Sequence, residues 1–138
     1  MRIALAAVVA LLLLVPAAAR ACSCALPGDD PHADVREADA AVWGKVVKRR
    51  VINQQTVRLR LRVIEDFKDN LGAFVRVTTG RYSSACGLTA RRGDKVGLLL
   101  YREGGHYGSG LCSVRTRGFL QRGASPESNP RAAAGACG

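Results

Sequence analysis

The chain has 138 residues, of which 48% are hydrophobic and 23% are charged, and its formal net charge is +10 at pH 7. This length predicts a single domain, large enough for a modest core that disulfides would help to stabilise. The surplus of lysine and arginine favours acidic partners, for example an anionic polysaccharide. A contribution to solubility alone is the simpler alternative.

The first 21 residues have the three parts of a secretory signal peptide. Arg2 makes the start positive, residues 3–15 are an apolar run without a charge, and Ala19-Arg20-Ala21 ends the segment with small residues at the two inspected positions. The run is shorter than the roughly 20 residues of a membrane span. We therefore expect cleavage after Ala21 and a secreted protein, extracellular or periplasmic, that begins at Cys22. Lipidation of Cys22 is an alternative, although that pathway favours a small residue where Arg20 stands.

All five cysteines follow the predicted leader, at positions 22, 24, 86, 112 and 137. Export makes disulfides the expected state of these cysteines. Neither the paired Cys-x2-Cys spacing of zinc sites nor a redox Cys-x-x-Cys is present, so we expect no structural metal and no cofactor. One cysteine of five is left over, and Cys137 near the end of the chain is the natural candidate.

Hydrophobic periodicity predicts one helix followed by five short strands. Asp30 and Pro31 are typical of a helix start, which places a helix at about residues 32–38. The clearest strand is 56–64, where apolar residues alternate with Arg58, Arg60 and Arg62. The other predicted strands are 41–52, 73–79, 94–102 and 106–114, with a short addition at 118–120. Gly44 within the first strand suggests a bulge.

This pattern predicts a mainly β domain, a small closed barrel or a sandwich, over residues 22–122. Residues 123–138 are rich in Ala, Gly, Ser and Pro, and we expect a flexible tail. The leader occupies residues 1–21. The basic side of strand 56–64 is a candidate polyanion-binding surface, formed by Arg58, Arg60 and Arg62, with Lys48, Arg49 and Arg50 on the preceding strand. Aromatic residues do not interleave with these arginines, so nucleic acid is not the expected partner.

Residues of catalytic type do not form a recognisable constellation. His32 lies beside a loop and His106 lies in a Gly-Gly turn, and neither has a nucleophile at a spacing that the sequence supports. No pair of carboxylates stands out as an acid and a base. The prediction is that the protein is not an enzyme.

Three cysteine-containing segments, one at the mature start and two in the interior, resemble the netrin-like domain. Cys22-Ser23-Cys24-Ala25-Leu26-Pro27 precedes a short helix and the run from Glu37 to Val47. Ser84-Ala85-Cys86-Gly87 and Leu111-Cys112-Ser113-Val114 continue the likeness. The chain looks most like the inhibitory domain of the tissue inhibitors of metalloproteinases and their bacterial relatives. The third disulfide of the animal domain has no counterpart.

The resemblance implies a five-stranded oligonucleotide/oligosaccharide-binding (OB-fold) barrel with a short N-terminal helix and two disulfides, Cys22–Cys86 and Cys24–Cys112. It also implies that the α-amine and carbonyl of Cys22 chelate the zinc of a secreted metalloprotease, while Ser23 enters the specificity pocket. Cys24, Ala85, Cys86 and Gly87 would support this contact. The alternative is a secreted module that binds matrix or another polyanion and inhibits no protease.

Overall fold

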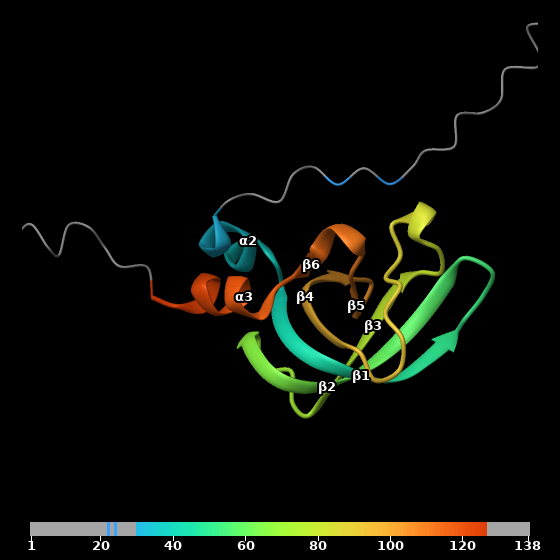
Figure 1. Ribbon diagram of the computed structural model, residues 1–138, viewed down its shortest axis with the longest axis horizontal. Coiled ribbons are helices and arrows are strands. Elements are labelled where there is room, and N and C mark those ends of the chain that lie inside the picture. Colours follow the sequence, from blue (N-terminus) through green and yellow to red (C-terminus); the bar gives the residue numbers. More distant parts are fainter. Residues whose placement is uncertain (1–21, 23, 25–29, 127–138) are drawn as a thin grey trace, which may run out of the picture.

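The computed structural model describes Cys22, Cys24 and residues 30–126. Five strands close a small barrel (Figure 1): β1 (Ala40–Val51), β2 (Thr56–Lys68), β3 (Phe74–Gly80), β4 (Lys95–Glu103) and β5 (His106–Gly108). Their order is β1-β2-β3-β5-β4, and a second pairing of β1 with β4 closes the barrel. The β3–β5 pair is parallel and the others are antiparallel. The mainly β fold with a closed barrel is confirmed, and its strand order is that of the OB-fold.

The barrel is closed because β1 is long and bends. It pairs with β2 along one edge and with β4 along the other, and its register with β2 shifts between Trp43 and Gly44. A Cβ at Gly44 would lie 3.0 Å from the carbonyl oxygen of Arg62. The predicted irregularity at Gly44 is therefore confirmed, and it lets one strand turn the corner between two partners.

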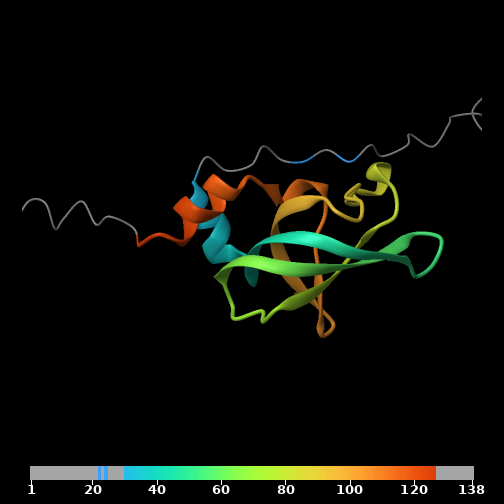
Figure 2. The same cartoon turned by 60° about the horizontal axis from the view of Figure 1, so that its bottom comes forward.

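Two short helices lie side by side at one end of the barrel, and the β1–β2 hairpin projects at the other end (Figures 1 and 2). Helix α2 (Pro31–Glu37) begins where expected, because the Asp30 carboxylate accepts a hydrogen bond from the His32 N–H. Helix α3 (Arg117–Ala124) is capped by Thr116 and packs on α2 through Gly123. Neither described helix is long or apolar enough to cross a membrane.

The core has two parts. The first fills the barrel with the inward side chains of the strands, and Val57, Leu59 and Leu61 of β2 have no exposed surface. The period-two prediction for this strand is therefore confirmed. The second lies between the barrel and the helices, where Leu99 of β4 packs with Leu120 of α3. Strand β4 is apolar on both sides, because Leu98 and Leu100 face the barrel core while Leu99 faces the helices, and burial of these side chains holds the two parts together.

Three predicted segments differ from the structure. Strand β2 continues to Lys68, whose ammonium donates to the carbonyls of Val35, Arg36 and Ala38 at the end of α2, at distances of 3.1, 2.5 and 2.5 Å. The expected strand 106–114 ends at Gly108, and the short addition at 118–120 lies within α3. That helix also extends past the expected domain end at residue 122. The predicted leader, Ser23 and the tail beyond residue 126, with Cys137, lie outside the described residues.

The shortened strand β5 has a structural reason. The Ser109 hydroxyl donates to the carbonyl of Leu99, and the Leu111 N–H donates to the carbonyl of Cys86. These bonds turn the chain out of the sheet into the 3-10 turn η2 (Leu111–Ser113) and then into β6 (Val114–Arg115), which pairs with β4. Cys112 is thereby placed on the rim of the barrel.

Candidate functional site: the disulfide ridge and the cationic sheet face

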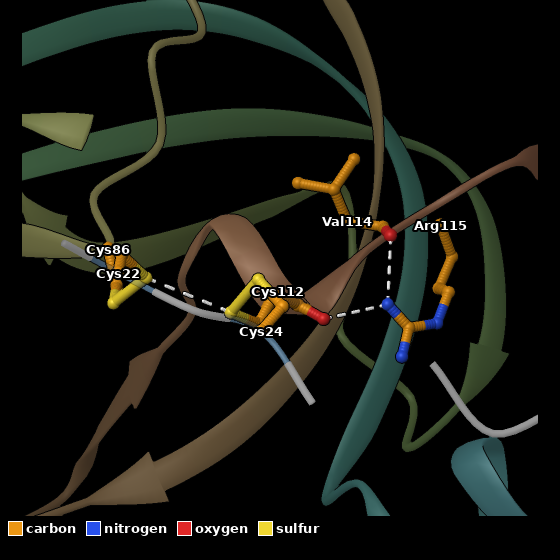
Figure 3. The surroundings of a disulfide bond; sticks show 6 residues. All are labelled: Cys22, Cys24, Cys86, Cys112, Val114 and Arg115. Atoms are coloured by element: carbon orange, nitrogen blue, oxygen red, sulfur yellow. Dashed lines mark hydrogen bonds between the residues drawn. A yellow bond between two sulfur atoms is a disulfide. The ribbon is translucent and has the colours of Figure 1, made fainter. Parts of the chain in front are cut away.

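Two disulfides attach the start of the predicted mature chain to the barrel (Figure 3). Cys22 is bonded to Cys86 and Cys24 to Cys112, with a Cα–Cα distance of 5.2 Å in each pair. The bridges span 64 and 88 residues of sequence. They join the cysteines that the resemblance implies. We call these four residues, together with Ala85, the disulfide ridge.

The sulfur atoms of the ridge are close neighbours. Cys22 Sγ lies 3.9 Å from Cys112 Sγ, and the Sγ atoms of Cys22, Cys24 and Cys112 lie within 4.8 Å of one another. Both close sulfurs are already bonded in disulfides, so the contact is one of packing rather than of hydrogen bonding. Zinc is bound by thiolates, and a disulfide sulfur carries no such charge. The cluster therefore acts as a covalent staple.

The segment that holds Cys86 is built on backbone geometry. The 3-10 turn η1 (Ser83–Ala85) ends at Cys86, which has a left-handed φ of 56°. A Cβ at the next residue, Gly87, would lie only 2.0 Å from the carbonyl oxygen of Gly80, so no larger residue fits there without movement. Ala85 and Cys86 are exposed and Gly87 is buried. Gly87 therefore shapes the ridge from below and offers little surface to a partner.

Exposed apolar side chains lie close in sequence to the cysteines of both cysteine-bearing turns. Tyr82 precedes η1 and is 54% exposed, while Leu111 and Val114 flank Cys112 and are 40% and 41% exposed. Leu111 and Val114 belong to a segment that carries the resemblance, whereas no sequence pattern pointed to Tyr82, which lies four positions before Cys86. An open hollow of about 420 Å³ borders Ala85 and Cys86. Apolar surface beside a rigid ridge is typical of a protein interface.

The second candidate surface is the outer face of β1, β2 and β3. The register places Lys48 opposite Arg60, Arg60 opposite Arg76, and Arg50 opposite Arg58. We call this the cationic sheet face, and it has seven members: Lys45, Lys48, Arg50, Arg58, Arg60, Arg62 and Arg76. Within residues 30–126, none of the seven forms an ion pair.

Like charges on facing strands repel one another, so this arrangement costs stability unless an anion is bound. Five of the cations line a hollow of about 350 Å³. The guanidinium of Arg60 stacks on the exposed ring of Phe74, 4.1 Å from its centroid. The candidate residues Arg58, Arg60 and Arg62 thus lie in a larger group, which includes the expected Lys48 and Arg50 of β1 and also Lys45 and Arg76. Arg49 pairs with the inward-facing Leu59 and is not part of the group.

Two further carboxylates, those of Asp69 and Glu65, are held by neighbouring side chains. The carboxylate of Asp69 accepts hydrogen bonds from Tyr107 and Arg102, and these two bonds, that of Tyr107 first, hold the pKa of Asp69 below its ordinary value. Bonding to Arg117 similarly lowers the pKa of Glu65. His106 is exposed and is the first residue of β5, directly after the Gly104-Gly105 turn in which it was expected.

The sequence matches no protein-family model and no curated protein.

Proposed function

We propose that the processed chain is a secreted netrin-like inhibitor of zinc metalloproteases, similar to the inhibitory domain of the tissue inhibitors of metalloproteinases. Cys22 is the residue that binds the protease zinc. The observation that carries the proposal is the pair of bridges, which attach positions 22 and 24 to two different turns of the barrel, η1 and η2. A chain cut after Ala21 would then present its new amine from a rigid support.

The chemistry follows from the coordination of a catalytic zinc. Such a metal has three protein ligands and an open position occupied by water. The amine and the carbonyl oxygen of Cys22 can close a five-membered chelate ring on the metal and displace that water. Because two disulfides already order this end of the chain, little conformational entropy is lost on binding. Ser23, which lies outside the described residues, follows directly and would enter the adjoining specificity pocket.

The surroundings of Cys22 support a role at an interface. Ala85 and Cys86 are exposed beside it, and Tyr82, Leu111 and Val114 add exposed apolar side chains close in sequence to the cysteines of the two turns. Burial of apolar side chains around a metal contact excludes water from that contact. The ridge would therefore supply both a ligand for the metal and an area for binding.

The test is to extend the mature protein by one alanine before Cys22. The amine then lies one residue too far from the Cys22 carbonyl, and the added residue fills the space at the metal. Inhibition of a susceptible secreted zinc endopeptidase should fall by orders of magnitude, while circular dichroism stays unchanged. Ser23→Gly is the matched control, because it keeps the chelate and changes only which proteases are inhibited. Equal inhibition by the native and extended proteins contradicts the mechanism.

The cationic sheet face favours a second candidate function, the binding of an anionic polysaccharide in the matrix or at a surface. Seven cations without an ion-pair partner among residues 30–126 cover the strands that OB-folds use to bind oligosaccharides and oligonucleotides. Phe74 is the exposed aromatic residue of this face and is already covered by Arg60. Because the exposed ring described on this face is paired with an arginine, the face favours a polysaccharide over single-stranded nucleic acid.

This function is tested on a heparin column with a salt gradient. Salt elutes the protein by screening the attraction between its cations and the sulfate groups of heparin. The double variant Arg60→Ser with Arg62→Ser lacks two of these cations, so it should elute at much lower salt than the native protein. Arg36→Ser with Arg122→Ser removes two equally exposed charges from the helices and is the matched control. If both double variants elute together, net charge alone explains retention. Tighter binding to a single-stranded oligonucleotide would point to nucleic acid instead.

A further inference from the structure

Arg115 of β6 makes a set of contacts that no other described arginine makes. Its Nε and one terminal nitrogen donate to Asp34 Oδ2, at 2.9 and 2.7 Å. Its other terminal nitrogen donates to the carbonyl of Cys112 at 2.7 Å and to that of Val114 at 3.0 Å, as Figure 3 shows. The guanidinium also lies over the ring of Phe119, 5.4 Å from its centroid. One side chain thus joins α2, η2, β6 and α3.

This ion pair is largely removed from water. The side chains of Arg115 and Asp34 are 11% and 17% exposed, whereas those of the Arg117–Glu65 pair are 53% and 26% exposed. The Arg115 guanidinium donates to one carboxylate and two carbonyls, and these bonds together fix its plane. The ammonium of lysine is not planar and cannot make the same set of bonds. The geometry around Cys112 is therefore set by a directional group that is only slightly exposed to water.

We infer that Arg115, oriented by Asp34, is a positioning residue for the N-terminal cysteines. Its hydrogen bond holds the carbonyl of Cys112, and the sulfur of Cys112 is bonded to Cys24. Cys24 is two residues from Cys22, whose sulfur is 3.9 Å from that of Cys112. An effect of Arg115 on inhibition rests on the proposed function. An effect of Arg115 on the Cys24–Cys112 bridge does not.

The other reading of these contacts is a general contribution to stability. The exposed pair Arg117–Glu65 provides the matched comparison, since it also joins an arginine to a carboxylate across two elements, α3 and β2. The hydrogen bond of Arg117 goes to Glu65, away from the cysteine turns. A positioning role for Arg115 predicts a local effect on Cys24–Cys112, whereas a general role predicts equal effects on both bridges.

The experiment measures the reduction of each disulfide by a dilute small thiol, under conditions where circular dichroism shows the fold intact. Alkylation and mass spectrometry identify the opened bridge. In Arg115→Lys, Cys24–Cys112 should open at least tenfold faster than in the native protein, and Cys22–Cys86 much less so. Arg117→Lys should leave both rates unchanged. If Arg115→Lys does not fold, Asp34→Asn, which keeps an acceptor, should show a smaller acceleration of the same bridge.

Unchanged rates in Arg115→Lys and Asp34→Asn, or equal acceleration of both bridges, overturn the inference. Where the native protein inhibits a zinc endopeptidase, Arg115→Lys should raise the inhibition constant about tenfold and Arg117→Lys should not change it. An inhibition constant of Arg115→Lys equal to that of the native protein also counts against the positioning role. If the native protein inhibits nothing, the proposed function fails, and the reduction rates still decide the role of Arg115.

Discussion

The two disulfides make a quantitative prediction, because they are coupled through the short stretch from Cys22 to Cys24, which are two positions apart. When Cys22–Cys86 is closed, the shortest path from Cys24 to Cys112 is not the direct stretch of 88 residues. It runs two residues back to Cys22, across the bridge, and 26 residues on from Cys86. The second bridge therefore closes a loop of only about 28 residues.

This path sets the size of the effect. The loop-entropy relation gives about 3.6 kcal/mol for a loop of about 28 residues, against about 4.6 kcal/mol for the direct stretch. By the same path, removing Cys22–Cys86 while Cys24–Cys112 remains also opens a loop of about 28 residues. The two bridges should thus contribute equally, although they span sequence lengths of 64 and 88 residues.

The assay is equilibrium urea unfolding, without reductant, of two double variants. Cys24→Ser with Cys112→Ser and Cys22→Ser with Cys86→Ser should each lower the free energy of unfolding by about 3.6 kcal/mol. With an m value of about 2 kcal/mol/M, each midpoint falls by roughly 2 M. The four cysteines are exposed or half-buried, so the serine hydroxyls remain hydrated. The shared loop of about 28 residues is refuted if either variant loses less than about 1 kcal/mol, or if the losses of the two variants differ by more than about 1 kcal/mol.

Three further changes test individual contacts. Lys68→Met removes the ammonium that donates to three carbonyls at the end of α2. The unfolding free energy should therefore fall by about 1–3 kcal/mol, and amide hydrogen exchange in α2 should accelerate. Unchanged exchange in α2 contradicts this role of Lys68. Gly87→Ala forces a methyl group against the carbonyl of Gly80, so we expect a loss of about 1–3 kcal/mol in urea, and a neutral result would show that the turn gives way. The hydrogen bond from Tyr107 lowers the pKa of Asp69, so its contribution is complete above the ordinary value of 3.8 and is lost as pH falls through the lower folded value. Acid unfolding of Asp69→Asn should be less steep than that of the native protein, and identical curves refute this assignment.

Local pattern predicted the parts of the fold that repeat along one strand or helix. The alternation of Val57, Leu59 and Leu61 with arginines is a property of neighbouring residues, so it was visible in the sequence. The end of β2 was not visible, because Glu65 and Asp66 are typical of a turn. Pairing of Ala41 with Lys68 and of Val42 with Asp66 keeps these residues extended, and such pairing depends on a distant strand.

The candidate site depended even more on distant contacts. The cysteine pairing came from the resemblance, since the sequence alone left the alternatives open. The Arg115–Asp34 pair joins residues 81 positions apart, and no spacing rule links them. The seven-membered cationic sheet face needed the register of three strands, of which only the β2 row was evident from its own alternation.

The central claim is that the Cys22 amine binds a protease zinc, and metal spectroscopy tests it most directly. A secreted zinc endopeptidase with its catalytic zinc replaced by cobalt absorbs visible light in a way that reports the ligands of the metal. Addition of the protein that begins at Cys22 should change this spectrum in a one-to-one titration, because an amine and a carbonyl replace water. The protein with one alanine before Cys22 should leave the spectrum unchanged. Identical spectra for both proteins, across a panel of such endopeptidases, would contradict the account.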